Sequence, residues 1–287
     1  MKLKACRQHA TLIVRKDNFI MTSTNVVIVG AGHMGSAIAL GLRRSNSFLS
    51  ITVIESNPIR RNEIITAGIP SLECLSDPLL SDVLILAIPP QTFLEFSKRT
   101  PQLEQYPGVI ISVMAGINIA ELKSRLKNSK ICRAIPNLPC AINEGVTALI
   151  CAPRLSKDNK GLINNLFSTL GTYFHVKDEN LIDDATAIIG GGPAYICYFA
   201  TALIEYAQSV GFESKSAFLM TTKILQGTAA LLEINQEPPE KLCQQVMTPK
   251  GTTELAINHF DKKHVRATII SGLKQSSRRS KILGGRT

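Results

Sequence analysis

No C-x-x-C pair occurs among the seven cysteines of this chain, and no histidine-rich segment lies near any of them. Disulfide frameworks and metal sites rest on such patterns, so the sequence predicts neither, and we expect no metal ion. We interpret the cysteines as reduced, mostly buried thiols of a cytoplasmic protein. They are Cys6, Cys74, Cys132, Cys140, Cys151, Cys197 and Cys243.

Acidic residues are also scarce, with 22 Asp and Glu against 32 Lys and Arg, which gives a net charge of +10. The excess lies at the two ends: residues 1–24 hold five basic residues and one acid, and residues 261–287 hold eight and one. The body between them is close to neutral, and it lacks the aromatic residues that alternate with basic ones in a nucleic-acid groove. We therefore expect no nucleic-acid partner.

The first 24 residues lack the apolar core and the small-residue cleavage pattern of a signal peptide. They show no clear periodicity, so we expect a flexible basic extension outside the fold. Met21 stands five residues before the first predicted strand, so an upstream start is the alternative explanation of this segment.

The sequence does contain a glycine-rich stretch, VVIVGAGHMGSAIALGL, from Val26 to Leu42. Gly30, Gly32 and Gly35 have the G-x-G-x-x-G spacing between an apolar strand and a helix. This arrangement allows a tight turn, close approach of a diphosphate to the backbone, and close packing of the helix on the strand. The helix N-terminus would then bind the diphosphate through its unpaired N–H groups. We predict a dinucleotide site here.

A second strand is predicted over 51–54, ending at Glu55, which lies 20 residues beyond Gly35. An acid in that position binds the ribose 2′-hydroxyl of NAD, whereas Arg60 and Arg61 could receive the 2′-phosphate of NADP. The sequence leaves these two cofactors in competition.

Apolar runs over 83–88, 109–113 and 131–135 are typical of strands that helices cover on both faces. Each ends at small residues or proline, which indicates a ligand crevice at the carboxyl ends of the strands. Further strands are expected over 146–151 and 173–176, with a helix over 156–170 between them. Beyond residue 177 the pattern is helical. We predict an α/β fold: a Rossmann-type, mainly parallel sheet domain over 25–177, then an all-α dimerisation domain over 178–287.

An uncharged segment over 185–204 is long enough to span a membrane. Its centre is Gly190-Gly191-Gly192-Pro193, which is expected to end one helix and start another. We favour a buried helix at a subunit interface and expect no membrane partner.

Four motifs follow one another along the chain: GAGHMG at 30–35, RAIPNLP at 133–139, GGGPAY at 190–195 and VMTPKGTTELAI at 246–257. Together they resemble the pyrroline-5-carboxylate reductase family, over about residues 25–282. The resemblance implies reduction of a cyclic imino acid, 1-pyrroline-5-carboxylate, to L-proline, the last step of proline biosynthesis. It also implies NADPH as the cofactor, with NADH as the alternative, and a homodimer or higher homo-oligomer.

The resemblance places the nicotinamide end of the cofactor near Ala87, Ala115, Pro136 and Asn137. It places the substrate carboxylate at Thr248, Gly251 and Thr252, with Thr253 as the catalytic residue that hydrogen-bonds the imine nitrogen, commonly across the subunit interface. The full set of residues assigned to the cofactor is Gly30, Gly32, His33, Met34, Gly35, Glu55, Ala87, Pro89, Ala115, Pro136 and Asn137.

The residues themselves agree with a carboxylate site, because Gly251-Thr252-Thr253 has the composition of a helix start with free N–H groups. An ordinary helix cap explains the same residues, and only the other three motifs favour the site. A C=N nitrogen can arrive already protonated, so no histidine is needed as a general acid.

Several residues depart from the family pattern, namely Pro89, Met114, Ile135, Ile189, Gly191 and Lys250. Two alternatives therefore remain: a related imine or β-hydroxyacid reductase, and a dinucleotide-sensing dimer without turnover. A β-hydroxyacid reductase typically carries a catalytic lysine on a helix after a glycine-rich segment, and residues 190–206 contain no lysine.

Overall fold

A computed structural model describes residues 22–128, 130–153 and 155–284 of the chain. Most of the expected basic extension, including Cys6, therefore lies outside the described residues. The first strand begins at Thr22, before the expected end of that extension, and Thr24 is already buried. The described residues form two units, residues 22–190 together with 277–284, and residues 191–276.

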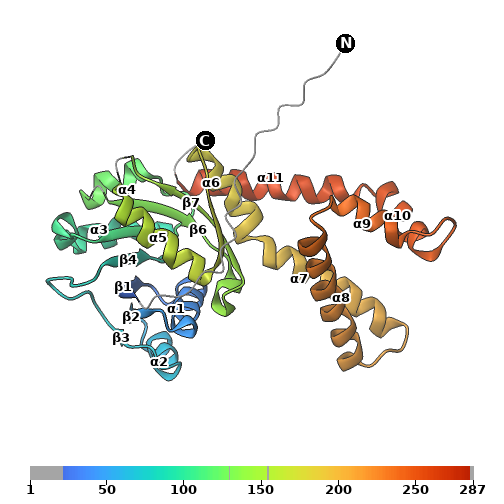
Figure 1. Ribbon diagram of the computed structural model, residues 1–287, viewed down its shortest axis with the longest axis horizontal. Coiled ribbons are helices and arrows are strands. Elements are labelled where there is room, and N and C mark those ends of the chain that lie inside the picture. The colour runs from blue at the N-terminus through green and yellow to red at the C-terminus, as the bar shows by residue number, and fades with distance from the viewer. Residues whose placement is uncertain (1–21, 129, 154, 285–287) are drawn as a thin grey trace, which may run out of the picture. The chain divides into compact units, whose positions relative to one another are not determined.

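The first unit contains an eight-stranded sheet in the order β3-β2-β1-β4-β5-β6-β7-β8 (Figure 1). Neighbouring strands are parallel except β6 and β7, which are antiparallel. The strands are β1 (Thr22–Val29), β2 (Phe48–Ile54), β3 (Ser71–Leu72), β4 (Val83–Leu86), β5 (Val109–Ser112), β6 (Ile131–Ile135), β7 (Gly145–Cys151) and β8 (Gly171–His175). The two-residue edge strand β3 was not expected, because so short a segment carries no periodic signal.

Helices cover both faces of this sheet, which explains why β4 and β5 are buried at every residue. One core cluster includes the helix residues Leu42 and Phe167, and the cluster on the other face includes Phe93 and Leu122. The helices of this unit are α1 (His33–Ser45), α2 (Pro58–Thr66), α3 (Phe93–Arg99), α4 (Ile119–Leu126), α5 (Lys157–Leu170) and α6 (Asn180–Ala185), with 3₁₀ turns at Pro90–Thr92, Pro101–Gln105 and Leu138–Ile142.

Helix α6 follows the last strand but still packs on the sheet, where its Ile182 joins a cluster with Ile135 and Ala148. Arg133 of β6 is almost fully buried and binds Glu179, just before α6, at 2.8 Å. The end of α11 also belongs to this unit, since Ser280 donates a hydrogen bond to Asp183. The end of the strand pattern at residue 177 therefore does not mark the end of this unit.

The second unit is helical and consists of α7 (Gly192–Ser209), α8 (Ser214–Asn235), α9 (Pro239–Val246), α10 (Thr252–Lys262) and α11 (Val265–Leu283) up to residue 276. A mainly parallel sheet followed by helices confirms the expected fold class. Many large apolar side chains in this unit are exposed, Tyr198 and Ile234 by 84% and 76%.

The glycine run at 190–192 does not separate two helices cleanly. A π-helical turn over Thr186–Gly190 connects α6 to α7, so the helical run extends over Asn180–Ser209. By length and composition alone, this run could cross a membrane, and only 11% of its most apolar window is buried within the described chain. Such a single helix is also found in proteins that do not enter membranes.

Candidate dinucleotide and substrate sites

The turn after β1 requires glycine at two of its three glycine positions. A Cβ atom on Gly35 would lie 1.9 Å from the carbonyl oxygen of Gly30, and one on Gly30 would lie 2.6 Å from that of Ala87. Gly30 also has a φ of +99°, which side chains disfavour. A Cβ on Gly32, in contrast, would meet nothing within 4 Å. Gly30 and Gly35 are thus needed by the protein, whereas Gly32 leaves space for a ligand.

The N-terminus of α1 fits a diphosphate. Gly32 is the N-cap residue, no side chain caps the helix, and its first turn contains no acid. The N–H groups at this end are therefore available to phosphate oxygens, with the helix dipole adding to their attraction. His33 and Met34 begin the helix, and both line a cleft at the carboxyl ends of the strands.

Glu55, which follows β2, is only 8% exposed and has two backbone partners. Its carboxylate accepts hydrogen bonds from the N–H of Ala31 at 2.7 Å and from the N–H of Asn57 at 2.8 Å. The side chain therefore ties the glycine turn to the start of α2. A carboxylate has further acceptor sites, so these two bonds leave room for a ribose hydroxyl.

The two arginines near Glu55 differ in their surroundings. The guanidinium group of Arg61 donates hydrogen bonds to the carbonyl oxygens of Glu55 at 2.8 Å and Ser56 at 3.3 Å. It also lies 3.6 Å from the Glu73 carboxylate. Arg60 is exposed and lines the cleft. Arg60 is consequently the better placed of the two for a 2′-phosphate.

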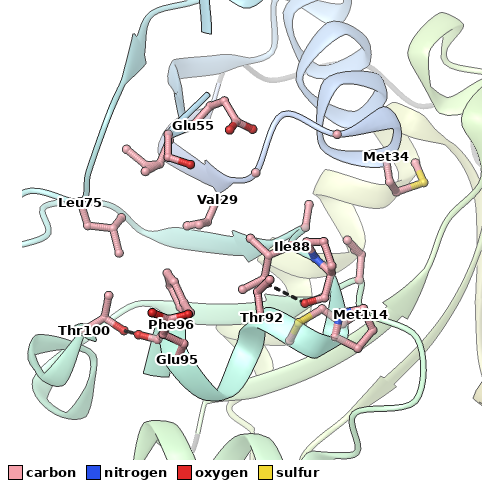
Figure 2. A pocket seen from close by; sticks show the side chains of 18 of the residues that line it. Val29, Met34, Glu55, Leu75, Ile88, Thr92, Glu95, Phe96, Thr100 and Met114 are labelled. Atoms are coloured by element: carbon pink, nitrogen blue, oxygen red, sulfur yellow. Dashed lines mark hydrogen bonds between the residues drawn. The ribbon is translucent and has the colours of Figure 1, made fainter. Parts of the chain in front are cut away.

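The cleft itself has a volume of about 760 Å³ and lies beyond the carboxyl ends of β1, β2, β4 and β5. Figure 2 shows Glu55 and Met34 on one side of it and Thr92 and Phe96 on the other. The expected cofactor residues that line it are Gly30, Gly32, His33, Met34, Glu55, Ala87, Pro89 and Ala115. Met114, which departs from the family pattern, also lines it.

Pro136 and Asn137 do not line this cleft. Pro136 is buried, and the side-chain oxygen of Asn137 accepts a hydrogen bond from the N–H of Val146 at 2.9 Å. Conversely, the sequence did not indicate the wall formed by Phe96, Arg99 and Gln102. These residues come from α3 and the turn after it, and nothing in their own spacing signals a ligand.

The four residues expected to bind substrate lie together at the start of α10 in the second unit. Gly251 is the N-cap residue, and its N–H donates to the carbonyl oxygen of Thr248 at 2.8 Å. A Cβ on Gly251 would lie 2.2 Å from Oγ1 of Thr248, so the turn requires glycine there. No side chain caps the helix at Gly251, and its first turn contains Thr252, Thr253 and the acidic Glu254. Because the Glu254 carboxylate is bound to the N–H of Lys250, this end of α10 can still receive a small anion.

Lys250, another departure from the family pattern, has a φ of +61°. This left-handed conformation favours glycine and costs other residues about 1–2 kcal/mol. The N–H of Lys250 donates to the Glu254 carboxylate at 2.6 Å, which helps to hold the turn. The turn thus forms without a glycine at this position, at the cost of local strain.

The chain is similar to known proteins over most of its length. Residues 179–283 match the family model described as pyrroline-5-carboxylate reductase dimerisation, and residues 25–116 match that described as NADP oxidoreductase coenzyme F420-dependent. The chain is 31% identical to a pyrroline-5-carboxylate reductase of Aquifex aeolicus, covering 92% of this chain and 99% of the relative. It is 30% identical to pyrroline-5-carboxylate reductase 3 of Mus musculus, covering 90% and 95%.

Solved structures show the same fold. The structure of a pyrroline-5-carboxylate reductase from Coxiella burnetii superposes with a TM-score of 0.79 at 26% identity, covering 91% of this chain and 99% of that one. A Plasmodium falciparum pyrroline carboxylate reductase with NADP bound superposes with a TM-score of 0.82 at 22% identity, covering 92% and 99%.

Proposed function

We infer that this chain, which belongs to the pyrroline-5-carboxylate reductase family, reduces 1-pyrroline-5-carboxylate to L-proline with NAD(P)H. The structural observation that supports this inference is the presence, in each of the two units, of a helix N-terminus that no side chain caps. One opens α1 at a cleft suited to a dinucleotide, and the other opens α10 at a turn suited to a small carboxylate.

The residues of the first unit fit a nicotinamide dinucleotide. We propose that the diphosphate occupies the open space at Gly32 and that Glu55 and Arg60, which line the same cleft, bind the adenosine ribose. We propose that Ala87, Pro89 and Ala115 border the nicotinamide, because they follow β4 and β5 at the cleft. When bound, the reduced nicotinamide supplies the hydride that the imine carbon receives.

Cofactor preference depends on whether Glu55 or Arg60 has the larger effect on binding of the adenosine ribose. A 2′-phosphate would be repelled by the Glu55 carboxylate and attracted by Arg60. We propose NADPH as the usual cofactor, as the family resemblance implies, with NADH as the alternative that Glu55 favours.

At the α10 N-terminus, we propose that Thr248, Gly251 and Thr252 bind the substrate carboxylate. Thr253 then hydrogen-bonds the imine nitrogen and fixes the rotation of the ring. A protonated imine already carries the proton that the product amine keeps, so these residues need only bind and orient the substrate. Pro136 and Asn137 remain proposed neighbours of the nicotinamide by resemblance only.

The helical unit supports a homo-oligomer, because it matches a dimerisation model and exposes many large apolar side chains. We propose a homodimer or a higher assembly in which a second copy covers this surface. We further propose a cytoplasmic location, without nucleic-acid or membrane partners.

The deciding experiment is an assay of NAD(P)H oxidation by the purified protein with 1-pyrroline-5-carboxylate. We expect oxidation that depends on the imino acid, with proline as the product. A β-hydroxyacid reductase would instead be active only on its own substrates, and a dinucleotide sensor would bind NAD(P)H without turnover. Either result would contradict the proposal.

A further inference from the structure

Two cysteines face each other across the antiparallel strands β6 and β7. Cys132 and Cys151 are register partners, and their sulfur atoms are 3.5 Å apart. The adjacent pair in the ladder is Ile131 and Ala152. It is hydrogen-bonded, since the N–H of Ala152 donates to the carbonyl oxygen of Ile131 at 2.8 Å. Hydrogen-bonded and non-hydrogen-bonded pairs alternate in such a ladder, so the cysteines occupy a non-hydrogen-bonded position.

This position suits a disulfide bond. Cα atoms of non-hydrogen-bonded pairs are about 4.5 Å apart, which lies within the range of about 4.4–6.8 Å that disulfides span. Closing the bond would bring the sulfur atoms from 3.5 Å to about 2.05 Å, and rotation of the side chains supplies most of that movement. The strands themselves need little displacement.

The two thiols differ in their access to solvent. Cys151 is partly exposed and lines a second cavity of about 740 Å³, distinct from the dinucleotide cleft. Cys132 lies behind it and is fully buried. A small oxidant in this cavity can therefore reach Cys151, whereas Cys132 can react only with a group already attached to its neighbour.

The charges around this cavity favour a thiolate at Cys151. The hydrogen bond with Cys132 is the largest cause of the lowered pKa of the Cys151 thiol; burial acts in the opposite direction, and the charge of Lys160 lowers the pKa further. Burial raises the pKa of the Cys132 thiol. The other titratable groups lining the cavity are Lys123, His175, Lys177 and Glu179. The Glu179 carboxylate is bound by Arg133, which leaves the cavity mainly cationic.

We propose that Cys151 and Cys132 form a reversible oxidation site for hydrogen peroxide, with Cys151 as the attacking thiolate and Cys132 as the resolving thiol. The sulfur of Cys151 attacks one peroxide oxygen, so an S–O bond forms and the O–O bond breaks. The sulfur is oxidised by two electrons to a sulfenic acid. The leaving hydroxide takes up the proton that the Cys151 thiol released and departs as water.

In the second step the sulfur of Cys132 attacks the sulfur of Cys151. The S–S bond forms, the S–O bond breaks, and the hydroxyl group leaves as water with the proton of Cys132. The product is a disulfide that links β6 to β7 and protects Cys151 from irreversible oxidation. A dithiol reductant reverses it. Neither cysteine lines the dinucleotide cleft.

The test is a non-reducing peptide map of the full-length protein after treatment with hydrogen peroxide near stoichiometric amounts. We expect a linked peptide pair containing Cys132 and Cys151, lighter by two hydrogen atoms than the separate peptides and abolished by dithiothreitol. It should form before the exposed Cys74 is oxidised. Oxidation of Cys74 while Cys132 and Cys151 stay reduced would overturn the proposal.

Variants then assign the two roles. In Cys132→Ser, Cys151 should stop at the sulfenic acid and be labelled by dimedone, whereas Cys151→Ser should leave Cys132 unlabelled. Cys197→Ser is the matched control and should form the linked pair normally. Labelling of Cys132 in Cys151→Ser would contradict the assignment of roles. The map of the unmodified protein needs no substitution, so the test stands even if a variant fails to fold.

Discussion

At the residue scale, Glu55 combines a structural bond with a proposed contact to the cofactor. Its carboxylate already accepts hydrogen bonds from the N–H groups of Ala31 and Asn57, so its orientation is fixed before any ribose arrives. Such preorganisation lowers the entropy cost of binding.

We predict that Glu55→Ser shifts cofactor preference toward NADPH, because it removes both a ribose acceptor and a charge that repels the 2′-phosphate. Loss of the two backbone contacts should also lower thermal stability, since an unpaired buried donor costs about 1–3 kcal/mol. Steady-state kinetics with both cofactors measure the shift, and Glu63→Ser on the exposed face of α2 is the control. A strong NADPH preference in the unmodified protein would instead indicate that Arg60 binds the 2′-phosphate and that Glu55 does not bind the ribose.

Thr253 is a half-buried residue in the first turn of α10. Thr253→Val keeps the side-chain shape and removes the hydroxyl proposed to orient the imine. We expect kcat/KM to fall about ten-fold or more, since each ~1.4 kcal/mol is a factor of ten. NADPH affinity, measured by fluorescence, should stay almost unchanged. Unaltered kcat/KM would mean that Thr253 does not contact the substrate and that this turn is an ordinary helix cap.

At the scale of elements, two substitutions in the glycine turn distinguish its role in protein packing from its role in ligand binding. Gly35→Ala would place a methyl group 1.9 Å from the carbonyl oxygen of Gly30, so we expect a large loss of stability. In Gly32→Ala the methyl group meets no protein atom within 4 Å and the φ of −69° is acceptable. We therefore predict an unchanged melting temperature with a loss of NADPH affinity of about ten-fold or more. Normal affinity in Gly32→Ala would show that the diphosphate does not approach this residue.

The last turns of α11 are held on the sheet unit by polar contacts with α6. Asp184 accepts a hydrogen bond from Ser277 and lies 3.3 Å from the Lys281 ammonium group. These partners hold the pKa of the Asp184 carboxyl below its usual value, with the Ser277 hydrogen bond as the largest cause. Because the carboxyl binds protons more weakly in the folded protein, its stabilising effect is present above the unfolded pKa and is lost as the pH falls.

We predict that Asp184→Asn flattens the decline of the melting temperature below about pH 4. The effect should be below about 1 kcal/mol, because the side chain is about half exposed and solvent screens its charge. Thermal melts over that pH range measure it, with the exposed Asp261→Asn as the control. If the melting temperature declined equally at low pH in the Asp184 variant and the unmodified protein, this prediction would be wrong.

At the scale of the whole molecule, the helical unit leaves many of its large apolar side chains exposed. Tyr198 on α7 is 84% exposed, and residues 179–283 match a dimerisation model. We predict that Tyr198→Glu weakens the homo-oligomer, because it places an unpaired charge on an apolar surface. Analytical ultracentrifugation should show smaller species than for the unmodified protein. Lys98→Glu, on an exposed part of the sheet unit, is the control and should leave the assembly intact. An unchanged assembly in Tyr198→Glu would place the interface elsewhere.

The sequence by itself determined the sheet-then-helices fold class, most of the strands and the glycine turn. These features are local: apolar runs define buried strands, and G-x-G-x-x-G fixes a turn within a few residues. It also indicated the start of α10, where Gly251 is required by the atoms of Thr248, only three residues away.

Only the tertiary structure decided which side chains are available to a ligand. Asn137 is engaged by Val146, Arg61 is engaged by the carbonyl of Glu55, and the end of α11 joins the sheet unit. It also paired Cys132 with Cys151, although no spacing along the chain connects them. The physical reason is that strand order and register bring together residues distant in sequence, and a local pattern carries no information about that pairing.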